Sequence, residues 1–165
     1  MRFAHFVKHG AALALFCVLL SSCGFHLKKA SYLPDDLRTI TLTADNPRSE
    51  VYELLKSDLE RAQVALLPTD SSSQYTALHL YKDTLERQTL SLFKNGQVAQ
   101  YELAYAVTYR VSRPGKEPVE QGFELYRNYQ DDPDNALAKA KELDIILREL
   151  RQLASKRIVR ELSQL

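Results

Sequence analysis

Histidine, cysteine and glycine are scarce in this chain, and their scarcity argues against several kinds of site. The 165 residues include four histidines, two cysteines and five glycines. No spacing of His with Cys, Asp or Glu suits a metal ion, and no glycine-rich stretch forms a phosphate loop. His79 lies between Leu78 and Leu80 in a strand pattern, which is more typical of a hydrogen-bonded structural residue than of a catalytic base. We therefore expect no metal, no cofactor and no catalytic residue.

A strong net charge and a long apolar run are also missing. Lys and Arg number 22 against 21 Asp and Glu, which gives a formal net charge of +1. This balance argues against nucleic acid as a partner. The apolar stretch Ala11–Leu20 has ten residues. At about 1.5 Å per residue it spans only half of a ~30 Å hydrocarbon core, so a secretory signal is favoured over a transmembrane helix.

The motif Leu20-Ser21-Ser22-Cys23 directly follows this apolar stretch and predicts a bacterial lipoprotein. Cleavage before Cys23 would remove the signal peptide, residues 1–22, and Cys23 would then carry several acyl chains. More than one chain anchors a protein stably to a bilayer. Gly24 follows the cysteine where aspartate would retain a lipoprotein in the inner membrane, which favours the outer membrane. With Cys17 discarded and Cys23 acylated, no thiol remains for a disulfide or a metal.

The rest of the chain is predicted to form a short tether and one domain. Residues 23–36 show little periodicity and are interpreted as a lipidated tether, whereas 37–165 has a length typical of a single domain with a core. Residues 39–43 alternate threonine with apolar residues, as in a half-buried strand. Asn46-Pro47 predicts a helix start with Asn46 as the cap, and apolar spacing continues that helix to about Gln63.

Three strands and a long helix are predicted to follow. The first strand covers residues 75–93, with a bulge or break near residues 82–83. Asn95-Gly96 then predicts a two-residue type I′ hairpin turn. Strict alternation over residues 101–111 indicates an antiparallel strand with one buried face, and a further strand ends near Gln130.

Asp132-Pro133 repeats the pattern of a capping residue followed by proline, and an uninterrupted helical pattern continues to Leu165. Helix capping explains the nearby aspartates, including Asp134, better than calcium binding does. The fold class predicted is α+β: a two-layer sandwich of a mostly antiparallel sheet with two helices on one face, in the order β-α-β-β-β-α. Either water or a partner covers the other face. In the second case the many tyrosines would be interface anchors.

Three motifs in register resemble the LptE family of lipopolysaccharide-assembly lipoproteins. They are Cys23–Leu27 at the start of the processed chain, Phe93–Gln97 with Tyr101 at the hairpin, and Asp132-Pro133 followed by Ala136–Lys139. The resemblance covers essentially the whole chain after the signal. Members usually carry Arg or Lys after the hairpin phenylalanine, as this chain does. They also carry an acidic residue soon after the Ala-Leu-Ala-Lys run, and here that acid comes later.

The resemblance implies a non-enzymatic outer-membrane lipoprotein on the periplasmic face. Such a protein plugs and helps to assemble a large LptD-like β-barrel, and it binds lipopolysaccharide during delivery to the outer leaflet. It also implies that Lys94 and Lys139 bind lipopolysaccharide, with lipid A phosphates as the partners of the two ammonium groups. Phe93 is either the last core residue of its strand or an exposed contact for acyl chains or barrel wall.

Other interpretations stay open from the residues alone. Lys94 and Lys139 can be ordinary solvated lysines, as most surface charges are. The chain can instead be a periplasm-facing pilot or assembly lipoprotein for another envelope channel, without glycolipid binding. A lipid-anchored hydrolase would depend on His79 and on scattered serines.

Overall fold

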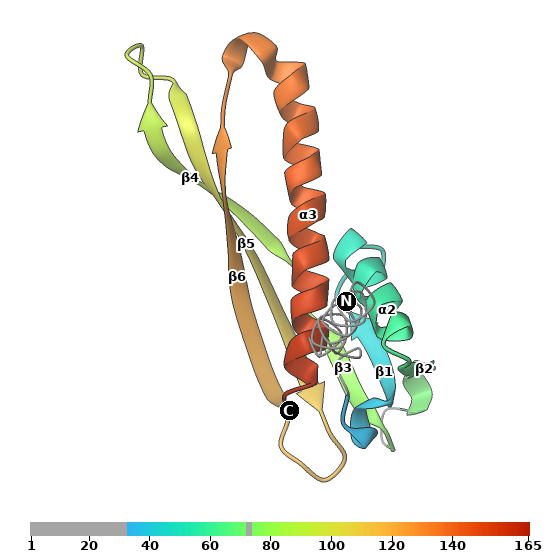
Figure 1. The fold of residues 1–165 in the computed structure, drawn as a ribbon. Helices are drawn as coiled ribbons and strands as arrows, with labels where there is room; N and C mark the ends of the chain where they lie inside the picture. The colour runs from blue at the N-terminus through green and yellow to red at the C-terminus, as the bar shows by residue number, and fades with distance from the viewer. Residues whose placement is uncertain (1–32, 72–73) are drawn as a thin grey trace, which may run out of the picture. The chain divides into compact units, whose positions relative to one another are not determined.

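Six strands form one mixed sheet, and two helices pack against it (Figure 1). The structure, a computed structural model, describes residues 33–71 and 74–165, so the signal peptide, Cys23 and most of the predicted tether lie outside the described residues. The elements are η1 (Asp35–Leu37), β1 (Thr39–Ala44), α2 (Glu50–Arg61), β2 (Ala65–Leu67), η2 (Thr69–Ser71), β3 (Thr76–Leu80), β4 (Thr84–Leu92), β5 (Val98–Ser112), β6 (Val119–Gln130), η3 (Pro133–Asn135) and α3 (Ala136–Leu162).

The long strand β5 organises the sheet. β6 runs antiparallel along one edge of β5, while β4 and β3 divide the other edge between them. β1 pairs in parallel with both β3 and β2. The predicted α+β class with two packed helices is confirmed, and the short strand β2 is an addition to the predicted order. The predicted break near residues 82–83 is also confirmed, because β3 ends at Leu80 and β4 begins at Thr84.

The start of α2 differs from the prediction. Asn46 does not cap the helix; its Oδ1 accepts a hydrogen bond of 3.2 Å from the Arg48 amide within a turn of its own. Ser49 is the cap, and its Oγ accepts from the Tyr52 amide at 3.4 Å. Asn-Pro is a strong turn former, and Ser49 is equally suited to satisfy a free amide at the first turn. The helix therefore begins at Glu50, three residues later than the Pro47 start that the sequence predicted.

The hairpin between β4 and β5 is present, but its turn is not type I′. A type I′ turn needs positive φ at both central residues. Gly96 has a φ of 84°, whereas Asn95 is not among the positive-φ residues. The Gly96 amide donates to the Phe93 carbonyl at 2.9 Å, and the Phe93 amide donates to the Gln97 carbonyl at 2.8 Å. The loop is thus longer by a residue, with glycine alone in the left-handed conformation that it adopts readily.

The core lies between the sheet and the two helices. Ile158 and Leu162 of α3 are buried to within 1% exposure, as are Leu55 and Leu59 of α2. They face the odd-numbered residues of β5, as the strict alternation predicted. Leu33 is also part of this core at 4% exposure, so packing begins before residue 37, where the sequence placed the domain boundary.

Polar contacts join the two helices along one side. Ser155 in α3 donates a hydrogen bond to the Asp58 carboxylate in α2. Nearer the start of α2, the Arg151 guanidinium lies 2.6 Å from Glu50. The partly exposed Arg151–Glu50 pair contributes about 0–1 kcal/mol, so apolar burial dominates the packing of the two helices.

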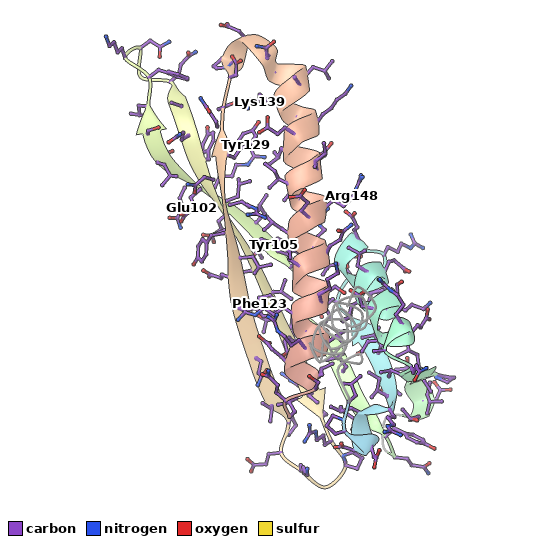
Figure 2. The ribbon with its side chains drawn as sticks, in the orientation of Figure 1. Glu102, Tyr105, Phe123, Tyr129, Lys139 and Arg148 are labelled. Carbon is purple, nitrogen blue, oxygen red and sulfur yellow. The ribbon has the colours of Figure 1, made fainter. Side chains whose placement is uncertain are left out.

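The tyrosines of the long strands are used inside the chain. Tyr105 donates to Asp83 at 2.8 Å, Tyr109 donates to Glu161 of α3 at 2.8 Å, and Tyr129 donates to the Lys139 carbonyl of α3 at 3.0 Å. Figure 2 shows Tyr105 and Tyr129 between the sheet and α3, with Glu102 on the opposite face. Burial, reinforced by these carboxylates, raises the pKa of both Tyr105 and Tyr109. A partner is therefore not needed to explain these tyrosines.

Candidate functional site

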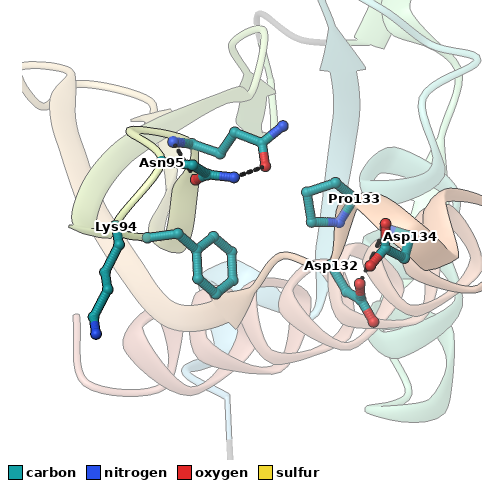
Figure 3. A pocket seen from close by; sticks show the side chains of 7 residues that line it. Lys94, Asn95, Asp132, Pro133 and Asp134 are labelled. Carbon is teal, nitrogen blue, oxygen red and sulfur yellow. Dashed lines mark hydrogen bonds between the residues drawn. The ribbon is translucent and has the colours of Figure 1, made fainter.

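Lys94 is presented at the end of the β4–β5 hairpin. β4 stops at Leu92, and the turn that follows leaves Lys94 exposed. Its ammonium group makes no hydrogen bond or ion pair with any residue that the structure describes. Figure 3 shows the side chain extending away from Asp132 and Asp134. Lys94 is therefore a cation free to meet an anionic group from outside the chain.

A hollow of about 720 Å³ separates this hairpin turn from the segment that leads into α3. Phe93 lines it and is 41% exposed, so Phe93 is not a core residue, and its contact with acyl chains or with a barrel wall stays a prediction. On the far side, Asp132 caps η3 by accepting from the Asp134 amide at 3.1 Å. A hydrogen bond from the Asn135 side chain lowers the pKa of Asp132. The residues lining the hollow are Phe93, Lys94, Asn95, Gln97, Asp132, Pro133 and Asp134.

Lys139 occupies a different setting in the first turns of α3. Its side chain is only 18% exposed and its Nζ lies 2.8 Å from the Glu142 carboxylate. The same Nζ lies 5.3 Å from the centroid of the Tyr129 ring, within cation–π range. The hydrogen bond to Glu142 raises the pKa of Lys139. Lys139 is thus a charged, oriented group between α3 and the sheet.

The structure brings only part of the predicted site together. Phe93 and Lys94 share the hollow, while Lys139 is not among its lining residues. η3 links β6 to α3; its first residues line the far side of the hollow, and Lys139 follows it in the first turns of α3. Sequence reasoning missed the roles of Tyr129 and Glu142. The spacing of three residues between Lys139 and Glu142 is the signal that could have found the ion pair.

The surface around the hairpin suits an amphiphile that carries negative charge. Leu90 and Leu92 on β4 are 47% and 60% exposed, close in sequence to the cation of Lys94. Among residues 33–71 and 74–165, no group of three side chains able to hold a metal ion is found. Within that same part of the chain, no helix is long and apolar enough to cross a bilayer.

The fold and this surface define a small α+β binding domain, and comparison with known proteins identifies its family. The family model described as "LptE: Lipopolysaccharide-assembly" matches residues 37–162. The chain belongs to this LptE family, which is non-enzymatic.

Relatives and solved structures agree with this assignment. The LPS-assembly lipoprotein LptE of Pectobacterium atrosepticum is 27% identical, over 91% of this chain and 82% of the relative. The LptE of Photorhabdus laumondii is 29% identical over the same shares. The crystal structure of rare lipoprotein B from Shewanella oneidensis is 35% identical, with a TM-score of 0.71, over 76% of this chain and 94% of that one. A solution structure of lipoprotein B from Nitrosomonas europaea, 22% identical with a TM-score of 0.68, over 85% of this chain and 90% of that one, shows the same fold.

Proposed function

We propose that this chain is the lipoprotein subunit of a lipopolysaccharide translocon in the outer membrane. Cys23 anchors it on the periplasmic face, the domain plugs a large LptD-like β-barrel, and the hairpin binds lipopolysaccharide on its way to the outer leaflet. The observation that carries the proposal is the free ammonium group of Lys94 beside the exposed ring of Phe93, in a chain of the LptE family. The signal motif at Leu20–Cys23 supports the anchor.

The chemistry of lipid A fits this pair of residues. Its phosphates carry negative charge, which an ammonium group binds as a flexible point charge. Its acyl chains are apolar, so Phe93 offers a surface whose burial is favourable by about 25 cal/mol per Å². Lys139 would contribute a second cation, with its ammonium group already oriented by Glu142 and by the Tyr129 ring.

A plug role is consistent with the composition of the surface. Large barrels in the outer membrane have polar interiors, and a domain of near-zero net charge can occupy one without strong repulsion. The sheet face opposite the helices carries Glu102, Thr108 and Arg110 together with Tyr126, which is 54% exposed. A mixed polar and aromatic face of this kind is typical of protein interfaces.

Reversing the charges of both lysines, Lys94→Glu with Lys139→Glu, is expected to weaken lipopolysaccharide binding by about tenfold or more, since each lost charge-assisted contact is worth about 1.5–3 kcal/mol. Lys94→Glu should leave the melting temperature unchanged because Lys94 is exposed, whereas Lys139→Glu should lower it slightly because it replaces the Lys139–Glu142 pair with two like charges. Titration of purified protein with lipopolysaccharide at low and high salt measures the effect. The difference between variant and wild type should shrink as salt rises.

A matched control is Lys116→Glu with Lys156→Glu, which makes the same change of charge at two exposed lysines away from the hollow. This control should bind like wild type. Equal losses in both double variants would mean that net charge alone controls binding. Unchanged binding in the Lys94 and Lys139 variant would remove both residues from the site.

The barrel partner is tested by purification in mild detergent from the native membrane. We expect a large β-barrel protein to copurify in a one-to-one ratio with the full-length chain. Recovery of a different channel, together with no binding of lipopolysaccharide, would support the pilot lipoprotein instead. Labelling by a serine-reactive probe would revive the hydrolase interpretation.

A further inference from the structure

Two arginines flank one buried leucine across three neighbouring strands. Leu103 of β5 pairs with Arg87 of β4 on one side and with Arg127 of β6 on the other. Neighbouring strands lie about 4.8 Å apart, so the two arginine backbones are separated by about 10 Å. Directly opposed residues on adjacent strands project from the same face of a sheet. The three side chains therefore form one row.

This row faces α3. Side chains alternate along a strand, so Arg127 shares its face with Tyr129, and Leu103 shares its face with Tyr105. Tyr129 donates a hydrogen bond to a backbone carbonyl of α3, which fixes the direction of that face. Leu103 is fully buried, whereas Arg87 and Arg127 are exposed.

Neither arginine has a partner of opposite charge. Arg87 and Arg127 make no hydrogen bond or ion pair with the residues that the structure describes. By contrast, the arginines that pair with a carboxylate in the same part of the chain are Arg38, Arg61, Arg110, Arg113, Arg148, Arg151 and Arg157.

In the described part of the chain, the carboxylates near the row already accept hydrogen bonds. The neighbouring positions on the same face of the three strands are Leu85, Thr89, Tyr101, Tyr105, Leu125 and Tyr129. Three acids lie near the row or its neighbour Tyr129, and each accepts a hydrogen bond. Asp83 accepts from Tyr105 at 2.8 Å, Glu142 from Lys139 at 2.8 Å, and Asp131 from the Asp132 amide at 2.9 Å.

The positive charge of the row extends to Lys139. Burial, together with the charge of Asp131, raises the pKa of Tyr129, and the charges of Lys139 and Arg87 oppose that rise. Both cations are therefore close enough to act on the same hydroxyl. With the Lys139 ammonium over the Tyr129 ring, cations from α3 and from β4 lie on the same face of the sheet, together with the carboxylates of Asp131 and Glu142.

We propose that Arg87 and Arg127 bind a phosphate group of an anionic amphiphile, at an exposed site on the α3-facing side of the sheet that is separate from the hollow of Lys94. Each guanidinium presents a planar fork of donors that matches phosphate oxygens. A phosphate between them replaces the repulsion of two like charges with two charge-assisted contacts. The inference rests on the proposed function for the source of the phosphate, which is lipid A.

The test compares wild type with Arg87→Gln plus Arg127→Gln. The probes are lipid A with two phosphates, inorganic pyrophosphate, and vesicles of phosphatidylglycerol. We expect the double variant to lose at least about tenfold in affinity for lipid A and for pyrophosphate. Its binding should also depend less on salt, because fewer ion contacts form. The matched control, Lys156→Gln plus Arg160→Gln, removes two exposed cations near the other end of α3 and should bind like wild type.

The outcomes separate this site from the proposed function. If wild type binds lipid A and the double variant binds equally well, the arginine site is wrong and the proposed function stands. If wild type binds no lipid A, the proposed function fails. In that case, if wild type binds pyrophosphate or the vesicles and the glutamine double variant does not, the arginine site stands, and its phosphate comes from a ligand other than lipid A. Wild type that binds none of the probes overturns the site.

A second variant guards against loss of folding. Arg87→Lys plus Arg127→Lys keeps both charges and removes only the bidentate geometry. Its affinity for lipid A should fall between wild type and the glutamine variant. An affinity equal to that of the glutamine variant, in a folded protein with an unchanged melting temperature, also supports recognition by the guanidinium forks. Wild-type affinity in both variants contradicts it.

Discussion

Replacing Ile158 with alanine is expected to lower the free energy of unfolding by about 2–5 kcal/mol. Ile158 is fully buried, in the core cluster that also holds Leu55 of α2 and Val107 of β5. Truncation removes apolar contacts and leaves a cavity that three separate elements cannot easily collapse to fill. A domain of this size has a total stability of about 5–15 kcal/mol, so the loss is a large fraction of it.

Ile145 provides a matched control on the same helix. It is 56% exposed, because the first half of α3 extends beyond α2 (Figure 1). Ile145→Ala should change the free energy of unfolding by no more than about 0.5 kcal/mol. Urea denaturation of both variants, followed by circular dichroism, measures the difference. Equal losses would contradict the placement of the core beneath the second half of α3.

Replacing Cys23 with alanine is expected to move the protein from the detergent phase to the aqueous phase in a Triton X-114 partition. Several acyl chains on Cys23 would anchor the wild type, whereas the domain itself offers no comparable apolar anchor. The variant is placed behind an ordinary cleavable secretion signal, so that a retained leader cannot hold it in the membrane. Mass spectrometry of the wild type should find residues 1–22 removed and acyl chains on Cys23.

Cys17 is the natural control for this experiment, as the other cysteine of the chain. Cys17→Ala, with the native signal retained, should leave processing and detergent partitioning unchanged, since Cys17 would be discarded with the signal. Detergent-phase partitioning of the Cys23→Ala protein would contradict anchoring through that residue. An unmodified thiol on a chain that still carries its leader would contradict the whole maturation scheme.

Most of the sheet could be predicted because its side-chain pattern is local. Odd-numbered apolar residues from Tyr101 to Val111 indicate both the strand and its buried face, because side chains alternate between the two faces of a strand with a period of two residues. The break between β3 and β4 was visible because Leu78 and Leu80 are in one phase and Leu85 in the other. Short β2, at Ala65–Leu67, was missed because three residues are too few to show a period.

Turns and caps were predicted less accurately, because neighbouring residues compete for the same role. Asn46 and Ser49 are both good capping residues, and the local sequence does not decide which amide each one reaches. Asn95-Gly96 is compatible with hairpin loops of more than one length. The observed loop is longer than a type I′ turn, and β4 has a bulge between Thr89 and Leu92 where it pairs with β5. Contacts from the rest of the sheet select among these local alternatives.

The sequence by itself indicated the family and the alternation of the strands, and it predicts the lipoprotein signal and the roles of Lys94 and Lys139, because each depends on adjacent residues or on a short period. Only the tertiary structure decided that Lys94 has no ion pair within the described residues while Lys139 is held by Glu142, and that Tyr109 and Tyr129 face α3. Only strand register placed Arg87 and Arg127 on either side of Leu103. The two arginines are forty residues apart in the chain. They come near each other only because β4 and β6 pair with the two edges of β5.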